Sequence, residues 1–213
     1  MDKIIYLRQL GLQNYQYTYN NMYDFTINRT HNTIDEIWLV EHYPIFTIGK
    51  SGTKKDIISP TNIPVIFSNR GGKITYHGPG QQILYVLLDL KRNNLNIKTL
   101  VKNLEKIIIY TLHELGLNAY FKNNAPGVYI QEKKICSIGL RIHKGCSLHG
   151  LALNINMDMS PFNNINPCGY HNISMAQLID FIPTINYNCI IKLLIKYFCY
   201  LFKYRIINEC INI

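Results

Sequence analysis

The sequence has few charged residues and no long apolar segment. Charged residues make up only 16% of the 213 residues and apolar residues 47%, a balance typical of globular rather than disordered chains. The most apolar stretch, CIIKLLIKYFCYLF at residues 189–202, is too short for a membrane span and contains Lys192 and Lys196. Since these lysines share one stripe at helical spacing, we expect a helix that is mostly buried in the core.

The six cysteines show no metal-binding pattern. They contain no C-x-x-C pair, and no H-x-x-x-H motif accompanies them, which argues against a structural zinc site. The N-terminal stretch MDKIIYLRQLGLQNY carries charges where a signal peptide would have its apolar region. We therefore expect reduced thiols, a cytoplasmic location and no bound metal.

The basic residues form no run of five or more, although the formal net charge is +9. An excess of positive charge favours an acidic partner. The abundance of asparagine, isoleucine, lysine and tyrosine also resembles drift toward AT-rich codons, which would give the same sign. Because recognition-helix, RNA-binding and zinc-finger motifs are missing, we expect no nucleic-acid partner. Because the most apolar stretch is short and contains lysines, we expect no membrane partner either.

Hydrophobic periodicity predicts the elements of the fold. Helices are expected at residues 12–28, 98–115, 174–182 and 189–202, with Gly116 as a C-terminal cap and Ser174 and Gln177 in capping-box spacing. Strands are expected at residues 36–48, interrupted by Tyr43-Pro44, and at residues 65–68, 83–90, 127–130, 134–142 and 147–155. Because the strands occur in adjacent runs, we expect an α+β fold, mainly of hairpins with packed helices, in one domain over residues 1–213.

The stretch RGGKITYHGPGQ, residues 70–81, is too rich in glycine for a regular element. Its glycines allow close approach of another group, and Arg70, Lys73 and His77 supply hydrogen-bond donors beside them. It lacks the patterns of a P-loop and of a dinucleotide-binding loop. The residues alone leave a structural turn and a substrate-binding loop equally open.

In the segment KKICSIGLRIHKGCSLHGLALNI, residues 133–155, apolar side chains alternate with small and polar ones. Ser137, Gly139, Gly150 and Ala152 are small enough to leave room for a ligand. Lys134 is expected on the face of Cys136 unless a bulge intervenes. A solvated lysine at a strand end is the alternative interpretation.

Cys168 lies in the loop-like stretch INPCGY. A cysteine in a turn is either inert or a nucleophile, and a nearby cation is the usual way to obtain the reactive thiolate at neutral pH. The residues alone favour the inert thiol, and they do not choose among the possible cationic neighbours. The candidate cationic neighbours are Lys134, Arg141, His77, His149 and His171.

Taken together, three stretches resemble the lipoyl(octanoyl) transferase family: DEIWLVEHYPIFTIGKSG, RGGKITYHGPGQ and the segment PGVYIQEKKICSIGLRIHKGCSLHGLALNINMDMSPFNNINPCGY. The similarity covers residues 35–177. It implies the fold of the biotin and lipoate protein ligase catalytic domain, with a mixed sheet. It also implies transfer of an octanoyl group from octanoyl-acyl carrier protein to lipoyl domains, those of 2-oxoacid dehydrogenases and of the glycine cleavage H protein, without any cofactor.

The same resemblance assigns residues of the site. Cys168 of the N-P-C-G motif is implied to be the acyl-thioester nucleophile, and Lys134 of K-I-x-S-x-G its acid-base partner. The residues implied to line the substrate site are Arg70, Gly71, Gly72, Lys73, Ile74, Thr75, Tyr76, His77, Ser137, Ile138, Gly139, Gly150, Leu151 and Ala152.

Three rival functions remain. An ATP-dependent lipoate or biotin ligase on the same fold is expected to have a longer loop ending in His-Asp, whereas this loop ends HGPGQ at residues 77–81. A non-catalytic module that sequesters lipoyl domains would not need Cys168 and Lys134. A cysteine hydrolase would use a histidine such as His77 or His149 as its base.

Overall fold

The structure, a computed structural model, describes residues 3–122, 125–167 and 174–208. Its helices are α1 (Tyr15–Ile27), α2 (Ile97–Glu114) and α3 (Tyr187–Phe202). Its strands are β1 (Lys3–Gln13), β2 (Asp35–His42), β3 (Ile45–Ile48), β4 (Val65–Phe67), β5 (Ile74–His77), β6 (Gln81–Leu87), β7 (Tyr120–Lys122), β8 (Ala125–Ile130), β9 (Lys133–His143), β10 (Cys146–Asn154) and β11 (Tyr204–Asn208).

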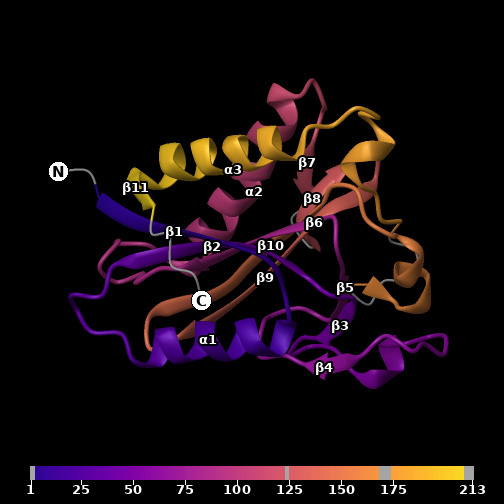
Figure 1. The fold of residues 1–213 in the computed structure, drawn as a ribbon, viewed down its shortest axis with the longest axis horizontal. Coiled ribbons are helices and arrows are strands. Elements are labelled where there is room, and N and C mark those ends of the chain that lie inside the picture. Colours follow the sequence, from indigo (N-terminus) through magenta and orange to yellow (C-terminus); the bar gives the residue numbers. More distant parts are fainter. Residues whose placement is uncertain (1–2, 123–124, 168–173, 209–213) are drawn as a thin grey trace.

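Two sheets organise the described residues. The larger has eight strands in the order β11-β1-β2-β6-β10-β9-β8-β7, in which β1 runs parallel to β11 and β2 and the other pairs are antiparallel. The smaller has the order β4-β3-β5. Figure 1 shows α1 on one face of the large sheet and α2 and α3 on the other. The α+β expectation with a mixed, mainly antiparallel sheet is confirmed.

Apolar side chains fill both faces of the large sheet. One core joins it to α2 and α3, with helix residues Leu100, Leu104, Ile107, Ile108, Leu112, Ile190, Leu194, Phe198 and Phe202. On the other face, Met22 of α1 packs against Trp38, Val40 and Tyr85. A sheet covered on both faces explains why β6 and β10 are buried along their whole lengths.

An asparagine begins each of the three helices. The side chains of Asn14, Asn96 and Asn186 accept a hydrogen bond from the backbone amide three residues later, at 3.1, 2.8 and 3.2 Å. Such caps satisfy an amide that has no partner within the helix. The helix predicted at residues 98–115 is confirmed, and Gly116 after it has a φ of +79°. Of the described helices, none is both long and apolar enough to cross a bilayer.

Three expectations about secondary structure are wrong. Residues before Asn14 form β1 rather than the start of a helix. Residues 74–77 form β5, although glycines surround them. The helix predicted from Ser174 is only a single turn, Leu178–Asp180, capped by Gln177, because residues 174–176 are extended and pair with Lys134.

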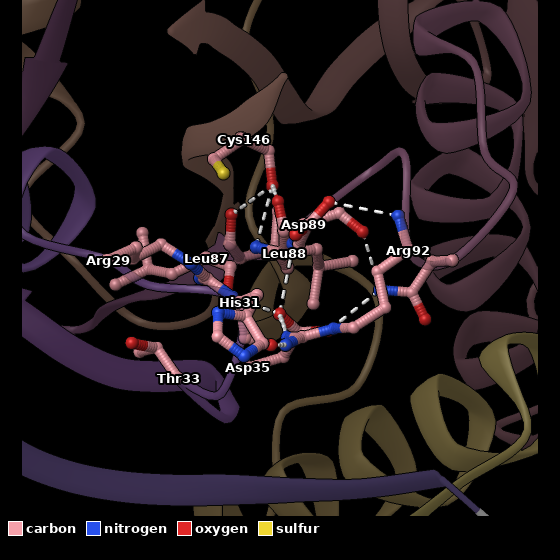
Figure 2. A network of polar contacts seen from close by, with 12 residues as sticks. Arg29, His31, Thr33, Asp35, Leu87, Leu88, Asp89, Arg92 and Cys146 are labelled. Carbon is pink, nitrogen blue, oxygen red and sulfur yellow. Dashed lines mark hydrogen bonds and ion pairs between the residues drawn. The ribbon is translucent and has the colours of Figure 1, made fainter. Parts of the chain in front are cut away.

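A buried carboxylate at the start of β2 binds several neighbouring segments. Asp35 at the start of β2 forms ion pairs with Arg29, which follows α1, and with Arg92, whose Nη2 lies 2.6 Å from Asp35 Oδ1 (Figure 2). The Asn93 amide and the Tyr204 hydroxyl also donate to this carboxylate. Burial alone would raise the pKa of Asp35, but these hydrogen bonds, that of the Asp89 amide and the charge of Arg29 lower it below its usual range.

Candidate active site

A cavity of about 580 Å³ opens beside β9 and β10, within the range of roughly 300–1,000 Å³ typical of small-molecule sites. It brings together segments far apart in the sequence. The predicted site residues among its lining are Arg70, Gly71, Gly72, Lys73, Ile74, Thr75, His77, Lys134, Ser137, Ile138, Gly139, Gly150, Leu151 and Ala152. Cys168 lies outside the described residues.

Tyr76 is the one predicted site residue, among those described, that the cavity does not include. Its ring is buried against Phe46 and Phe162, with ring centroids 5.5 and 5.6 Å apart. The reason is the alternation of side chains along a strand. Because residues 74–77 form β5, Thr75 and His77 face the cavity while Tyr76 points into a separate apolar cluster.

A β-bulge turns Lys134 into the cavity. Cys136 pairs with Val128 of β8, but Lys134 pairs with Tyr129, so Ile135 is an extra residue on β9. A bulge shifts the alternation by one position. Ile135 and Cys136 therefore both pack into the core, and Lys134 shares the cavity with Ser137 and Gly139. The sequence predicts Lys134 on the face of Cys136 only if no bulge intervenes. This bulge does intervene, and it places the two side chains on different faces.

Lys134 is 2% exposed and is held from several sides. Its Nζ donates a hydrogen bond to the Pro126 carbonyl oxygen at 2.8 Å and lies 5.7 Å from the centre of the Tyr129 ring. The next residue, Gly127, has a φ of +133°, and a Cβ there would lie 2.5 Å from Lys134 Cε. The absence of a side chain at Gly127 thus gives the lysine its path into the cavity.

The backbone of Lys134 pairs with residues that closely follow INPCGY in the sequence. Its amide donates to the Ser174 carbonyl oxygen at 2.8 Å, and its carbonyl oxygen accepts from the Ala176 amide at 2.9 Å. Lys134 and Met175 form a parallel bridge. The chain therefore returns to Lys134 six residues after Cys168.

Arg70 starts a buried chain of hydrogen bonds. Its Nε and Nη2 donate to Thr47 Oγ1 at 3.1 and 2.9 Å, and that hydroxyl lies 3.2 Å from His77 Nε2. His77 Nδ1 lies 2.7 Å from Gln81 Oε1. Since the amide oxygen can only accept, Nδ1 carries the proton and Nε2 accepts from Thr47. Both ring nitrogens of His77 are thus engaged.

Burial keeps the histidines beside the cavity neutral. It lowers the pKa of His77 to about 3, with further contributions from His42 and Arg70, and it lowers the pKa of His149 to about 3, with a contribution from Arg70. His149 also bonds to Asn69 Oδ1 at 2.6 Å through Nε2 and stacks against Tyr19. Neither histidine supplies a cation there at neutral pH.

Lys134 is thus the cation among the predicted candidates that the structure places in the cavity. Arg141 does not line it, and His171 lies outside the described residues. Arg70 and Lys73, which the sequence suggests only as hydrogen-bond donors, also line the cavity as cations, and Arg70 is bonded to Thr47. Its bonds to a backbone carbonyl and a hydroxyl suit a role in holding the loop.

None of the four cysteines that the structure describes lines the cavity. Cys136, in the K-I-C-S-I-G stretch, points into the core, and burial raises the pKa of its thiol to about 12. A thiol in this state is a small apolar side chain rather than a nucleophile.

The small residues of β9 and β10 make room for backbone as well as for a ligand. A Cβ at Gly150 would lie 1.9 Å from the Leu84 carbonyl oxygen of β6, and one at Gly139 would lie 3.1 Å from the Gly71 carbonyl oxygen. The Gly71 amide donates to the Leu140 carbonyl oxygen at 2.8 Å. Gly139 therefore lets the 70–72 segment lie against β9 and close one side of the cavity.

A family model of the lipoyl protein ligase A/B catalytic domain matches residues 14–199. The chain is 53% identical over 209 residues to an octanoyltransferase of Haemophilus influenzae strain PittEE, covering 97% of this chain and 99% of that relative. The chain belongs to the octanoyltransferase family. An octanoyltransferase of Escherichia coli O17:K52:H18 is 55% identical over 195 residues, covering 92% of this chain and 91% of the relative.

Solved structures confirm the expected fold. Lipoate-protein ligase A bound with ATP superposes with a TM-score of 0.81 at 16% identity, covering 100% of this chain and 90% of that one. Biotin protein ligase from Aquifex aeolicus in complex with biotin and ATP superposes with a TM-score of 0.58 at 15% identity, covering 95% and 71%. The expectation of an acyltransferase of the octanoyltransferase family is confirmed by the sequence relatives.

In this member of the octanoyltransferase family, several residues of the cavity were not predicted. They are Tyr15, Ser51, Ile83, Tyr85, Ile97, Val101, Ala125, Pro126, Leu140 and His149, of which His149 was considered only as a cation or base. Most are apolar residues that resemble core positions in the sequence. Pro126 differs from these, because it precedes Gly127, and a glycine within a strand indicates that other atoms approach the backbone closely.

Proposed function

We propose that this chain moves an octanoyl group from octanoyl-acyl carrier protein to the lysine side chain of a lipoyl domain, through a thioester on Cys168. We further propose that residues 1–213 act as one octanoyltransferase domain in the cytoplasm, where thiols stay reduced. The acceptors would be the lipoyl domains of 2-oxoacid dehydrogenases and the glycine cleavage H protein. No cofactor is needed, because the donor thioester is already activated.

The observation that carries the proposal is the placement of Lys134. It is a buried lysine in a cavity lined by both motif stretches, and its backbone pairs with Ser174 and Ala176, shortly after N-P-C-G. A nearby ammonium stabilises a thiolate. The names of the sequence relatives support the octanoyl group as the cargo.

In the first half of the proposed reaction, the Cys168 thiolate attacks the carbonyl carbon of the donor thioester. A carbon–sulfur bond to Cys168 forms, the bond to the carrier's thiol breaks, and Lys134 gives its proton to the departing thiolate. In the second half, the acceptor amine attacks the Cys168 thioester. Neutral Lys134 takes a proton from that amine, an amide forms and the Cys168 thiolate is released.

The geometry disfavours a histidine-based hydrolase. His77 uses both ring nitrogens within the protein, and His149 stacks against Tyr19 and is bonded to Asn69 through Nε2. A general base must be free to reach the proton that it removes. Burial also lowers the pKa of both histidines to about 3, so they are weak bases at neutral pH.

Intact-protein mass spectrometry after mixing with octanoyl-carrier protein tests the proposal. We expect a covalent octanoyl adduct that disappears when a lipoyl domain is added, and no adduct in Cys168→Ser. Cys136→Ser serves as the matched control and should keep the adduct. An equally abundant, transferable adduct in Cys168→Ser contradicts the assignment. Modification of the lipoyl domain from octanoic acid and ATP, but not from the thioester, would instead identify a ligase.

A further inference from the structure

A second hollow, of about 490 Å³, lies next to the cavity, between the first turns of α2 and strand β7. We refer to it as the donor groove, and it is lined by Ile97, Lys98, Val101, Lys102, Glu105, Phe121, Lys122 and Pro126. Ile97, Val101 and Pro126 also line the cavity. Since the two hollows share these walls, the donor groove adjoins the cavity that contains Lys134.

Exposed apolar groups and lysines border the donor groove. Ile97 is 47% exposed and Phe121 44% exposed, on opposite sides of it. Lys98 and Lys102 lie one turn apart on α2 and are exposed. Among the described ion pairs neither takes part, whereas Lys122 on the opposite side pairs with Glu132 at 2.7 Å. The groove therefore offers apolar walls with positive charge at its edge, and its inner lining includes one buried carboxyl group, that of Glu105.

We propose that this groove receives the acyl donor: an acidic carrier protein docks against Lys98, Lys102 and Lys122, and its phosphopantetheine-type arm lies along the groove. The arm is a slender, mostly uncharged chain with one phosphate at its protein end. An apolar channel with lysines at its outer edge matches both parts of it. Oppositely charged surfaces also steer the encounter of two proteins.

The shape of the groove favours the donor over the acceptor. The acceptor presents a lysine side chain, which is much shorter than the donor's arm and needs no second channel of nearly the same volume as the cavity. The donor's long arm needs a binding channel between its carrier protein and the reacting thioester. The proposal rests on the proposed function, because it assumes a thioester donor that is carried by a protein.

The test compares two double variants with the same change in net charge. Lys98→Glu with Lys102→Glu reverses the edge of the groove. Lys91→Glu with Lys192→Glu reverses two exposed lysines that line neither hollow. Steady-state rates are measured with octanoyl-carrier protein, with octanoyl-pantetheine, which lacks both protein and phosphate, and with varied lipoyl domain.

We expect the groove variant to raise KM for octanoyl-carrier protein about tenfold, since charges at the edge of an interface act mainly on association. Rates with octanoyl-pantetheine and KM for the lipoyl domain should stay at the wild-type values, and the control variant should change none of them. Added salt should raise KM for the carrier protein more steeply in the wild type than in the groove variant.

Three results overturn the proposal. An unchanged KM for the carrier protein would show that it docks elsewhere, and a raised KM for the lipoyl domain alone would assign the groove to the acceptor. A loss of turnover with octanoyl-pantetheine equal to the loss with the carrier protein would mean that the variant damages the cavity rather than the docking. If the wild type transfers octanoyl from neither donor, the proposed function fails as well, a result that is distinct from these three.

Discussion

The backbone amide of Lys134 donates a hydrogen bond to the carbonyl oxygen of Ser174 at 2.8 Å. These residues are 40 positions apart in the sequence, and the pairing holds the start of β9 against the chain that follows N-P-C-G. It also holds Lys134 at the point where the bulge turns its side chain into the cavity. Lys134 thus takes part both in the backbone pairing of the sheet and in the reaction that we propose.

The first prediction separates Lys134 from its neighbour. Lys134→Ala should slow formation of the octanoyl adduct by roughly 10²–10⁴-fold, the usual contribution of a general acid or base. Lys133→Ala should hardly change it, because Lys133 is exposed and does not line the cavity. Quenched time courses with mass detection give both rates. Equal losses from the two variants would show that neither lysine has the specific role.

The position of Lys134 also shows what the sequence could not predict. Strict alternation would place Lys134 with Cys136, and the bulge at Ile135 is what separates them. A bulge depends on the pairing between β8 and β9, which a single strand's pattern does not contain. The motif stretches can be recognised from the sequence alone. Assigning Lys134 to one face of β9, however, requires the pairing of β9 with β8.

Other failures have related causes. The parallel strands β1 and β11 join the two ends of the described chain, residues 3–7 and 204–208, and no local pattern announces such a distant pairing. Residues 74–77 form a strand because β3 pairs with them, and that pairing sends Tyr76 away from the cavity. By contrast, α2 and α3 were predicted well, since their apolar stripes are long and repeat locally.

The second prediction concerns Gly127. Gly127→Ala should lower kcat, because the new Cβ would lie 2.5 Å from Lys134 Cε. Gly145→Ala is the matched control: Gly145 also has a positive φ, of +82°, but a Cβ there meets nothing within 4 Å. Gly145→Ala should lose about 1 kcal/mol of stability from backbone strain. Gly127→Ala should lose more, because its Cβ would also lie 2.4 Å from the Cys136 carbonyl oxygen. At temperatures where both variants are folded, only Gly127→Ala should lose activity.

A double-mutant cycle decides whether Gly127 acts through Lys134. In the Lys134→Ala background, the further substitution Gly127→Ala should add little to the loss of kcat, since the side chain that it displaces is already gone. Rates are compared at temperatures where all variants are folded, as judged by circular dichroism. Fully additive losses would indicate general damage to the sheet rather than positioning of Lys134.

The third prediction concerns the reactivity of Cys136. Burial raises the pKa of this thiol to about 12, so iodoacetamide at about pH 8 should leave Cys136 unmodified in the folded protein. Cys189, which is exposed, should react under the same conditions. Peptide mapping by mass spectrometry locates the label. Labelling of Cys136 without denaturant would contradict its placement in the core.

The fourth prediction concerns Asp35, whose buried carboxylate binds Arg29, and the side chain of Arg29 is itself only 4% exposed. Asp35→Asn should cost about 3–5 kcal/mol in urea unfolding at neutral pH, because it leaves a buried cation unpaired. The folded-state pKa of Asp35 is lowered, so this contribution is complete above the ordinary carboxyl pKa of about 4 and is lost as the pH falls through the lower folded value. The difference between wild type and variant should therefore shrink below about pH 4.

Glu114→Gln, which removes the exposed pair with Lys196, is the control and should barely move the urea midpoint. A difference for Asp35→Asn that stays constant down to acid pH would show that its charge does not stabilise the fold.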